Sequence, residues 1–442
     1  MGETHHKRCN DIMTAKPLNQ LTASEIVAAI AAKKTTAEAV ARACLDHIAA
    51  REPQVEAWQF LDPDLVIKQA RALDASGKVG PLQGVPVGIK DIIDTADMPT
   101  EYGTPIHKGH RPRIDAALVA LTRRAGGIIM GKTVTTEFAN RHPGKTHHPK
   151  DHARTPGGSS SGSAAAVGDC MVPLAVGTQT TGSTIRPAAF CGCVGYRPTW
   201  GDIRCHGVME ASGSVDTVGL IARSAEDIAL YRDVVLGVTP QPLAAQIMSP
   251  PRIGFCRTPF WNQCEPTTQN SLEDCAAKLA KAGAIVSDVS LPEAFSQIED
   301  AHRWVTSFEF ARNRSWEIDH HYEMISETLR NNRLKDGLAC SFEKYRESRS
   351  TLARLRRMMH DVFKDFDVLL VPASSGEAPV GLNATGNASH CLIGTSTHVP
   401  CMTLPLFTGP NGLPVGAQFM AARNNDRLLF EAARWVMANV AR

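Results

Sequence analysis

The sequence lacks both a long apolar run and an excess of charge of either sign. No stretch approaches the ~18 consecutive apolar residues of a membrane-spanning helix. Lys and Arg together number 47 and Asp and Glu 45, so the net charge is +2 and no broad field attracts nucleic acid. The opening segment, MGETHHKRCNDIM, is polar and has no apolar stretch behind it, which argues against a signal peptide. We therefore expect a cytoplasmic protein with no nucleic-acid partner and no membrane association.

Dense cysteine, internal repeats and long low-complexity linkers are also missing. The 12 cysteines among 442 residues are too dilute for a disulfide scaffold, and we expect reduced thiols. Cys191 and Cys193 form one close pair but lack the second pair that a zinc site needs, so we expect two buried small residues. With no linker to divide the chain, we predict a polar segment at 1–20 and a single domain at 21–442.

What the chain does contain is an alternation of helical and strand patterns. Capping residues and apolar periodicity predict helices at 22–50, 65–75, 115–126, 224–237, 271–283, within 297–364 and at 426–440. Short apolar runs predict strands at 84–91, 127–131, 171–176, 251–256, 284–291, 367–373 and 413–421. Strands that alternate with helices predict an α/β fold with a large sheet.

One motif satisfies the spacing of a phosphate-binding loop. The segment GGIIMGKT at 126–133 places Gly126, Gly131 and Lys132 at the required positions. A phosphate loop, however, is an open turn between a strand and a helix. Here the intervening residues are themselves the predicted strand and no strand precedes them, so we reject nucleotide binding at this segment.

A second motif satisfies the G-x-S-x-G pattern of a hydrolase nucleophile elbow. The segment GSSSG at 158–162 would make Ser160 the nucleophile. That elbow requires a buried strand leading into a sharp turn. The preceding segment, KDHARTP, is polar and ends in proline, so its context does not fit.

Several histidines gather around the polar loop 143–152. They lack the i,i+4 helical spacing and the carboxylate partner that a metal site of this kind requires. We expect a solvated loop and no metal site.

Three further segments carry candidate chemistry, and each has a simple structural interpretation when taken alone. Lys90 ends the apolar strand in GVPVGIKD, so its amine must be desolvated or paired, most simply with Asp91 or Asp94. The serine run in TPGGSSSGSAAAV opens what reads as a helix. Ser183 lies in GTQTTGSTIRPAAFCG, where it is placed to cap a helix.

Taken together and in order, these segments resemble the amidase signature family from about residue 20 to residue 440. The resemblance implies a large mixed β-sheet covered by α-helices and a Ser–Ser–Lys triad. Residue by residue, it makes Ser183 the nucleophile, Ser159 the proton relay and Lys90 the general base. A neutral lysine near pH 7.5 requires its pKa to fall by roughly three units from about 10.4, which burial can supply.

The resemblance also assigns supporting roles around the triad. Backbone N–H groups of Thr180, Thr181, Gly182 and Ser183 would surround the oxyanion of the tetrahedral intermediate. Glycines in the serine run would allow close approach and a sharp turn. Ser160 and Ser161 would satisfy N–H groups at the helix start.

Three residues depart from the family pattern near the nucleophile. Gln179 replaces the usual Asp, Thr181 replaces the usual Gly, and the arginine moves from the second to the third position after Ser183, to Arg186. A β-branched residue such as Thr181 would be strained at positive φ. We interpret the three as a variant that supports the oxyanion turn in another way.

The leading hypothesis is a cofactor-free amidase that hydrolyses the carbon–nitrogen bond of a small-molecule amide. Carbamate- or urea-derivative hydrolysis and the glutaminase component of a tRNA-dependent amidotransferase remain alternatives from the same family, and a homodimer is a family-level expectation. A non-catalytic binding protein would not need the intact triad residues.

Substrate choice is expected to lie within residues 300–345 and 380–403. His398 and Cys401 in the second range could contact substrate, although a structural role is favoured for both. No obvious carboxylate-binding arginine stands there, which favours small or neutral amides.

Overall fold

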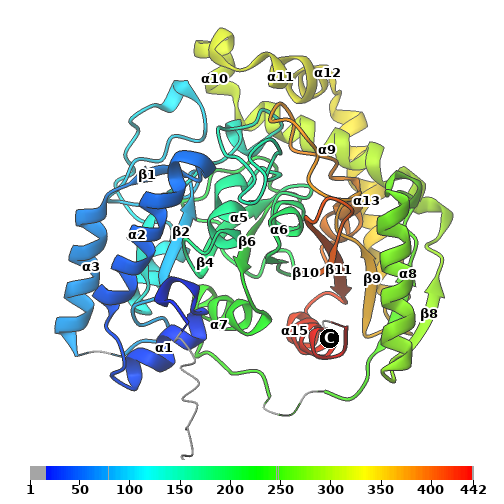
Figure 1. Cartoon of the computed structure of the whole chain (residues 1–442). Helices are drawn as coiled ribbons and strands as arrows, with labels where there is room; N and C mark the ends of the chain where they lie inside the picture. The colour runs from blue at the N-terminus through cyan, green and yellow to red at the C-terminus, as the bar shows by residue number, and fades with distance from the viewer. Residues whose placement is uncertain (1–15, 78, 245, 247, 441–442) are drawn as a thin grey trace, which may run out of the picture.

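The computed structural model describes residues 16–440 except for positions 78, 245 and 247. Most of the polar segment predicted at 1–20 lies outside the described residues, so the division into that segment and one domain at 21–442 stays a prediction. A single sheet runs through the molecule with helices on both faces (Figure 1). None of the helices in the described ranges combines the length and the apolar character that crossing a bilayer requires.

The sheet has 11 strands in the order β1-β3-β2-β4-β6-β5-β10-β11-β9-β7-β8. β2 pairs in parallel with β3 and β4, and β7 with β8 and β9, whereas the remaining pairs are antiparallel. The predicted α/β class and the mixed sheet are therefore confirmed. The strands are β1 (Trp58–Leu61), β2 (Pro86–Lys90), β3 (Ile128–Thr133), β4 (Leu174–Gln179), β5 (Val194–Arg197), β6 (Thr217–Ala222), β7 (Arg252–Cys256), β8 (Ile285–Val289), β9 (Val368–Pro372), β10 (Cys401–Thr408) and β11 (Pro414–Ala421).

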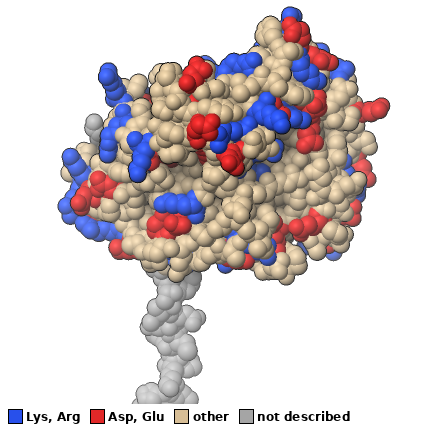
Figure 2. Space-filling view, turned by 90° about the horizontal axis from the view of Figure 1, so that it is seen from above, with Lys and Arg blue, Asp and Glu red and all other residues tan. Residues whose placement is uncertain are grey.

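Helices cover both faces of this sheet, and three short ones, α10, α11 and α12, lie together at one edge of the molecule (Figure 1). The helices are α1 (Ala23–Ala31), α2 (Ala37–Val55), α3 (Pro63–Ser76), α4 (Ala117–Arg124), α5 (Ser161–Gly168), α6 (Ile185–Cys191), α7 (Ala225–Leu236), α8 (Pro266–Lys281), α9 (Ile298–Asn313), α10 (Ser315–His321), α11 (Glu327–Leu329), α12 (Lys335–Ala339), α13 (Phe342–Val362), α14 (Leu392–Thr397) and α15 (Asp426–Val440). Seen from above, basic and acidic side chains are interspersed over the surface, in keeping with the small net charge (Figure 2).

The core lies on both faces of the sheet because strand residues alternate between them. In β4, Leu174 and Val176 join the cluster under α7 and α15, whereas Ala175 joins the cluster under α2 and α5. In β9, Leu370 faces the first cluster and Leu369 faces a third one beneath α9 and α13. Central strands buried on both faces explain the unbroken apolar runs in the sequence.

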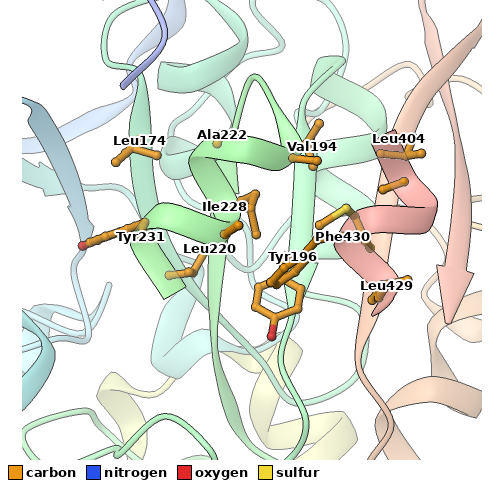
Figure 3. Packing of buried hydrophobic residues seen from close by; sticks show 14 of the residues in the cluster. Leu174, Val194, Tyr196, Leu220, Ala222, Ile228, Tyr231, Leu404, Leu429 and Phe430 are labelled. Atoms are coloured by element: carbon orange, nitrogen blue, oxygen red, sulfur yellow. The ribbon is translucent and has the colours of Figure 1, made fainter. Parts of the chain in front are cut away.

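On the α7 and α15 side of the core, side-chain contacts join β5 and the residues after it to α15. Tyr196 stacks edge-to-face on Phe430, with ring centroids 4.9 Å apart (Figure 3). Asp426, at the start of α15, accepts hydrogen bonds from the Tyr196 hydroxyl and from the Thr199 hydroxyl, the latter at 2.6 Å. The closing helix is thereby fastened to the middle of the sheet.

Most predicted elements are present, and the rejected motifs behave as expected. The would-be phosphate loop is β3 itself and follows α4, and Ser160 follows a segment with no strand. Cys191 and Cys193 are buried free thiols, as predicted. The prediction of a wholly solvated histidine loop is wrong for His148, which is buried with Nε2 2.9 Å from the Phe190 carbonyl oxygen.

We expect stability to depend on the shared core beneath α7 and α15. Leu220 in β6 is fully buried, so Leu220→Ala should lower the free energy of unfolding by about 2–5 kcal/mol through lost burial and a residual cavity. Leu338→Ala is the matched control because Leu338 is 53% exposed, and its effect should stay within about 0.5 kcal/mol. Urea denaturation followed by circular dichroism measures both, and equal losses would contradict this account of the core.

Candidate active site

The candidate site begins where two parallel neighbouring strands end. Ile89 in β2 pairs with Val176 in β4, so Lys90 comes level with Gly177, one residue before Thr178, near the carboxyl ends of both strands. In α/β sheets this edge is where ligands commonly bind. The register therefore brings Lys90 and Thr178 close together along the chain direction at this edge.

Lys90 is fully buried, and its amine hydrogen-bonds to two hydroxyl groups and to no other group within the described residues. Nζ lies 2.7 Å from Ser159 Oγ and 2.8 Å from Thr178 Oγ1. The simple expectation of an ion pair with Asp91 or Asp94 is wrong, because Asp91 instead lies 3.2 Å from Lys132 Nζ. Burial without a contacting carboxylate lowers the pKa of Lys90 to about 7, although the charge of Asp216 opposes the shift.

The serine run is shaped by glycines that approach other backbone closely. Gly157 has φ +83°, and a Cβ there would lie 2.9 Å from the Pro187 Cα. The predicted capping roles of Ser160 and Ser161 are wrong. Ser160 Oγ accepts from the Thr178 N–H at 3.2 Å, and Ser161 Oγ donates to the Gly157 carbonyl oxygen at 2.9 Å. These two hydroxyls fix the turn, which leaves Ser159 as the serine that reaches Lys90.

Ser183 lies against this run through its backbone. The Ser160 N–H donates to the Ser183 carbonyl oxygen at 3.3 Å, and Ser183 is 8% exposed. Its hydroxyl makes no hydrogen bond to any residue in the described part of the chain. The structure thus brings Lys90 and Ser159 into direct contact and sets Ser183 beside the serine run, with a hydroxyl that has no partner among the described residues.

The turn Thr180–Ser183 is held by its side chains, and its amides stay free. Thr180 Oγ1 donates to Asp216 Oδ1 at 2.6 Å, and Thr181 Oγ1 lies 3.0 Å from His302 Nε2. None of the four N–H groups of this turn donates a hydrogen bond within the described residues. Thr181 is not among the residues with positive φ there, so the strain considered from its β-branching does not arise.

Gln179 clamps the two ends of that turn together. Its Oε1 accepts from the N–H groups of Thr184 and Ile185, at 2.9 and 3.0 Å, and so caps α6. Its Nε2 donates to Thr395 Oγ1 at 3.0 Å, and Thr395 Oγ1 donates to the Thr181 carbonyl oxygen at 2.6 Å. One neutral amide therefore fastens the turn to both α6 and α14.

Arg186 fastens the serine run from behind. Its NH2 group donates to the Gly158 carbonyl oxygen at 2.6 Å and to Thr385 Oγ1 at 3.0 Å, while NH1 donates to the Gly386 carbonyl oxygen at 2.7 Å. Burial lowers the pKa of Arg186 to about 10. The arginine thus holds the peptide just before Ser159 in place.

A cavity of about 250 Å³ opens beside Thr178 and Thr180. Its lining comes mostly from the segment 200–217, to which the sequence analysis assigned no role, and apolar side chains dominate it: Ile92, Ala139, Ile203, Val208 and Met209. Asp216 also borders it, and burial raises the pKa of this carboxyl to about 6. In the sequence, the one feature that could have drawn attention to Asp216 is its position directly before the apolar run 217–222.

His398 and Cys401, the two residues considered for substrate contact, are surrounded by other residues of the protein. His398 lies 2.8 Å from the Ser214 carbonyl oxygen through Nε2 and stacks on Trp200 at 4.4 Å. Cys401 is fully buried in β10. Within the described residues, no group of three or more His, Cys, Asp or Glu side chains is placed to hold a metal ion.

Known proteins resemble this chain over most of its length. A curated relative from Chloroflexus aggregans, a component of its glutamyl-tRNA(Gln) amidotransferase, is 31% identical over 456 residues, covering 91% of this chain and 93% of the relative. The corresponding component from Acidothermus cellulolyticus is 40% identical over 296 residues, which span 61% of this chain and 58% of the relative.

Solved structures agree over nearly the full length. A crystal structure described as an amidase superposes with a TM-score of 0.88 at 26% identity, covering 95% of this chain and 100% of the other. The peptide amidase of Stenotrophomonas maltophilia gives 0.79 at 27% identity, covering 96% and 98%. A sequence model of the Amidase family matches residues 39–430, and the chain belongs to that family.

Proposed function

We propose that this protein hydrolyses the carbon–nitrogen bond of a carboxamide through an acyl-enzyme on Ser183. The observation that carries the proposal is the buried Lys90 amine, which contacts Ser159 and touches no carboxylate among the described residues. Because its pKa is lowered to about 7, this amine is available as a neutral base at ordinary pH.

In the proposed reaction, Ser183 Oγ attacks the amide carbonyl carbon. The proton of Ser183 passes to Ser159, whose own proton passes to Lys90 Nζ, because a hydroxyl both donates and accepts. When the carbon–nitrogen bond breaks, the relay runs backwards and the leaving amine takes the proton. Water then attacks the acyl carbon and its proton passes along the same path to Lys90. The bond between the acyl carbon and Ser183 Oγ breaks, the proton returns through Ser159 to Ser183, and the acid is released.

The negative charge on the carbonyl oxygen has a proposed site in the turn before Ser183. The N–H groups of Thr180, Thr181, Gly182 and Ser183 are free of other partners among the described residues, and each donor aimed at such an oxygen is worth about 3 kcal/mol. Gln179 and Asp216 hold this turn without occupying its amides. Preorganised donors of this kind need no rearrangement during the reaction.

The apolar lining of the cavity of about 250 Å³ favours an uncharged amide with an apolar body. A second candidate function is the glutaminase component of a tRNA-dependent amidotransferase, which the curated relatives favour by name. A third is hydrolysis of a carbamate or urea derivative, which the same three residues could perform on another acyl group.

Replacing either serine should stop turnover while the fold survives. Ser183→Ala removes the nucleophile and is expected to lower kcat by about 10³-fold or more, and Ser159→Ala removes the relay and should cost about 10²–10⁴-fold. Ser350→Ala is the matched control, since Ser350 is exposed on α13 and its hydroxyl bonds only to the Arg346 carbonyl oxygen among the described residues, so it should retain full activity. Activity preserved in Ser183→Ala would reject the nucleophile assignment.

The rate should rise with pH as Lys90 loses its proton. Lys90 is protonated below its pKa of about 7 and cannot act as base, so kcat/KM should climb from pH 6 and level off above pH 8. Asp216, with a pKa raised to about 6, is a second titrating group nearby. In Asp216→Asn the rising limb should persist and move to lower pH, because the Asp216 charge raises the pKa of Lys90. A flat profile from pH 6 to 9 in the unsubstituted protein would exclude a titrating base.

Amine and ammonia release from a substrate panel would test the proposed activity directly. The purified chain, without added partners, should hydrolyse neutral aliphatic or aryl amides faster than glutamine, because the cavity lining is mainly apolar. Turnover confined to carbamates or ureas would identify the third function. Glutamine hydrolysis only in the presence of partner proteins would identify the second.

A further inference from the structure

A second cavity, of about 240 Å³, shares Trp200 as a lining residue with the cavity beside Thr178 and Thr180. Trp200 borders both cavities, and His398, which stacks on it, borders only the second. The remaining lining consists of Ser214, Val305, Arg349, Leu352, Arg356 and Arg423. Three of these side chains are arginines, whereas no described residue of the lining is acidic.

The arginines converge because of helix geometry. Arg349, Leu352 and Arg356 are three and then four residues apart on α13, so they share one face of that helix. Arg423 reaches the same cavity from the segment that follows β11. Three guanidinium groups thus meet from two separate parts of the chain.

These arginines have no ion-pair partner in the described part of the chain. Arg356 donates from Nε to the Ser396 carbonyl oxygen at 2.9 Å, and Arg349 donates to the Tyr345 hydroxyl at 3.5 Å, but neither lies within 4 Å of a described carboxylate. Arg423 likewise forms no ion pair there. Many other arginines of this protein pair with Asp or Glu, as Arg303 does with Asp336, so the cluster stands apart.

Nearby charges leave this cluster with a positive surplus. Two carboxylates lie near enough to interact with it: Glu309 is occupied by hydrogen bonds from Ser212, Ser214 and the Tyr345 hydroxyl, and Asp202 pairs with Arg232. Arg197, which is fully buried, adds another positive charge. Burial, and then the charges of Arg197, Arg349 and Arg423, lower the pKa of Arg356 to about 10, and the charge of Glu309 opposes this shift.

We propose that this arginine cavity binds a compact, doubly charged oxyanion of the phosphate class. Guanidinium forks bond to phosphate oxygens in pairs, and a dianion would offset most of the charge of three arginines, which a monocarboxylate would not. The volume of about 240 Å³ accommodates free phosphate with water or the phosphate group of a small monoester. The site is separate from the triad and does not depend on the proposed amidase reaction.

Isothermal titration of the full chain with inorganic phosphate, at constant ionic strength set with chloride, tests the proposal. Saturable binding is expected, and Arg356→Gln should weaken it by about tenfold or more because a charge-assisted hydrogen-bond partner is lost. Arg423→Gln should weaken it similarly, and since Arg423 is exposed this second variant carries little risk to folding.

Arg354→Gln is the matched control. It lies on the same helix and changes the net charge equally, but Arg354 bonds to Gln297 outside the cavity, so phosphate affinity should not change. Equal weakening in all three variants, or no saturable binding to the unsubstituted chain, would overturn the proposal. Binding of succinate but not phosphate would overturn the assigned class. Comparison with glycerol 3-phosphate would tell whether a free or an esterified phosphate fits better.

Discussion

The burial of one lysine without a carboxylate is the constraint around which the candidate site is organised. Lys90 and Lys132 emerge from neighbouring strands, β2 and β3, and both are fully buried. Lys132 has Asp91 at 3.2 Å, which stabilises its charged form against burial, whereas Lys90 has only two hydroxyls. Burial lowers the pKa of both lysines, but Asp91 opposes this effect at Lys132, whereas no described carboxylate contacts the Lys90 amine, whose pKa falls to about 7.

The other described residues near Lys90 hold the serines in position, and none of them places a carboxylate in contact with the Lys90 amine. β2 and β4 set the register, Arg186 holds the peptide before Ser159, and Gln179 joins the turn to α6 and α14. Asp216 carries the only nearby acidic group among the described residues that the lysine feels, and it is directed at Thr180 and at two backbone amides. Of the three departures from the family pattern, Gln179 and Thr181 make side-chain contacts that hold the turn, whereas Arg186 holds the serine run instead.

The sequence predicted the fold class and the failure of two misleading motifs, and it named Lys90 and Ser159, which the structure places in contact. It missed contacts that depend on the direction of a side chain. Asp91 follows Lys90 directly, yet successive residues leaving a strand point to opposite sides, so the adjacent carboxylate was the wrong partner. Strands β1, β5, β6 and β10 were not predicted; β1 and β5 have only 4 residues each, and β10 contains Pro405, which obscured its pattern. The lining at 200–217 comes from irregular backbone, for which periodicity carries no signal.

Gln179 gives the turn a property that a carboxylate at the same position would not. An amide neither gains nor loses a proton across the working range, so the cap on α6 keeps its polarity whether the medium is acidic or alkaline. Asp216, which holds the same turn through Thr180, does titrate, so the contact at Thr180 can change with pH while the Gln179 cap does not. The amide thus makes one of the two anchors of the turn independent of protonation.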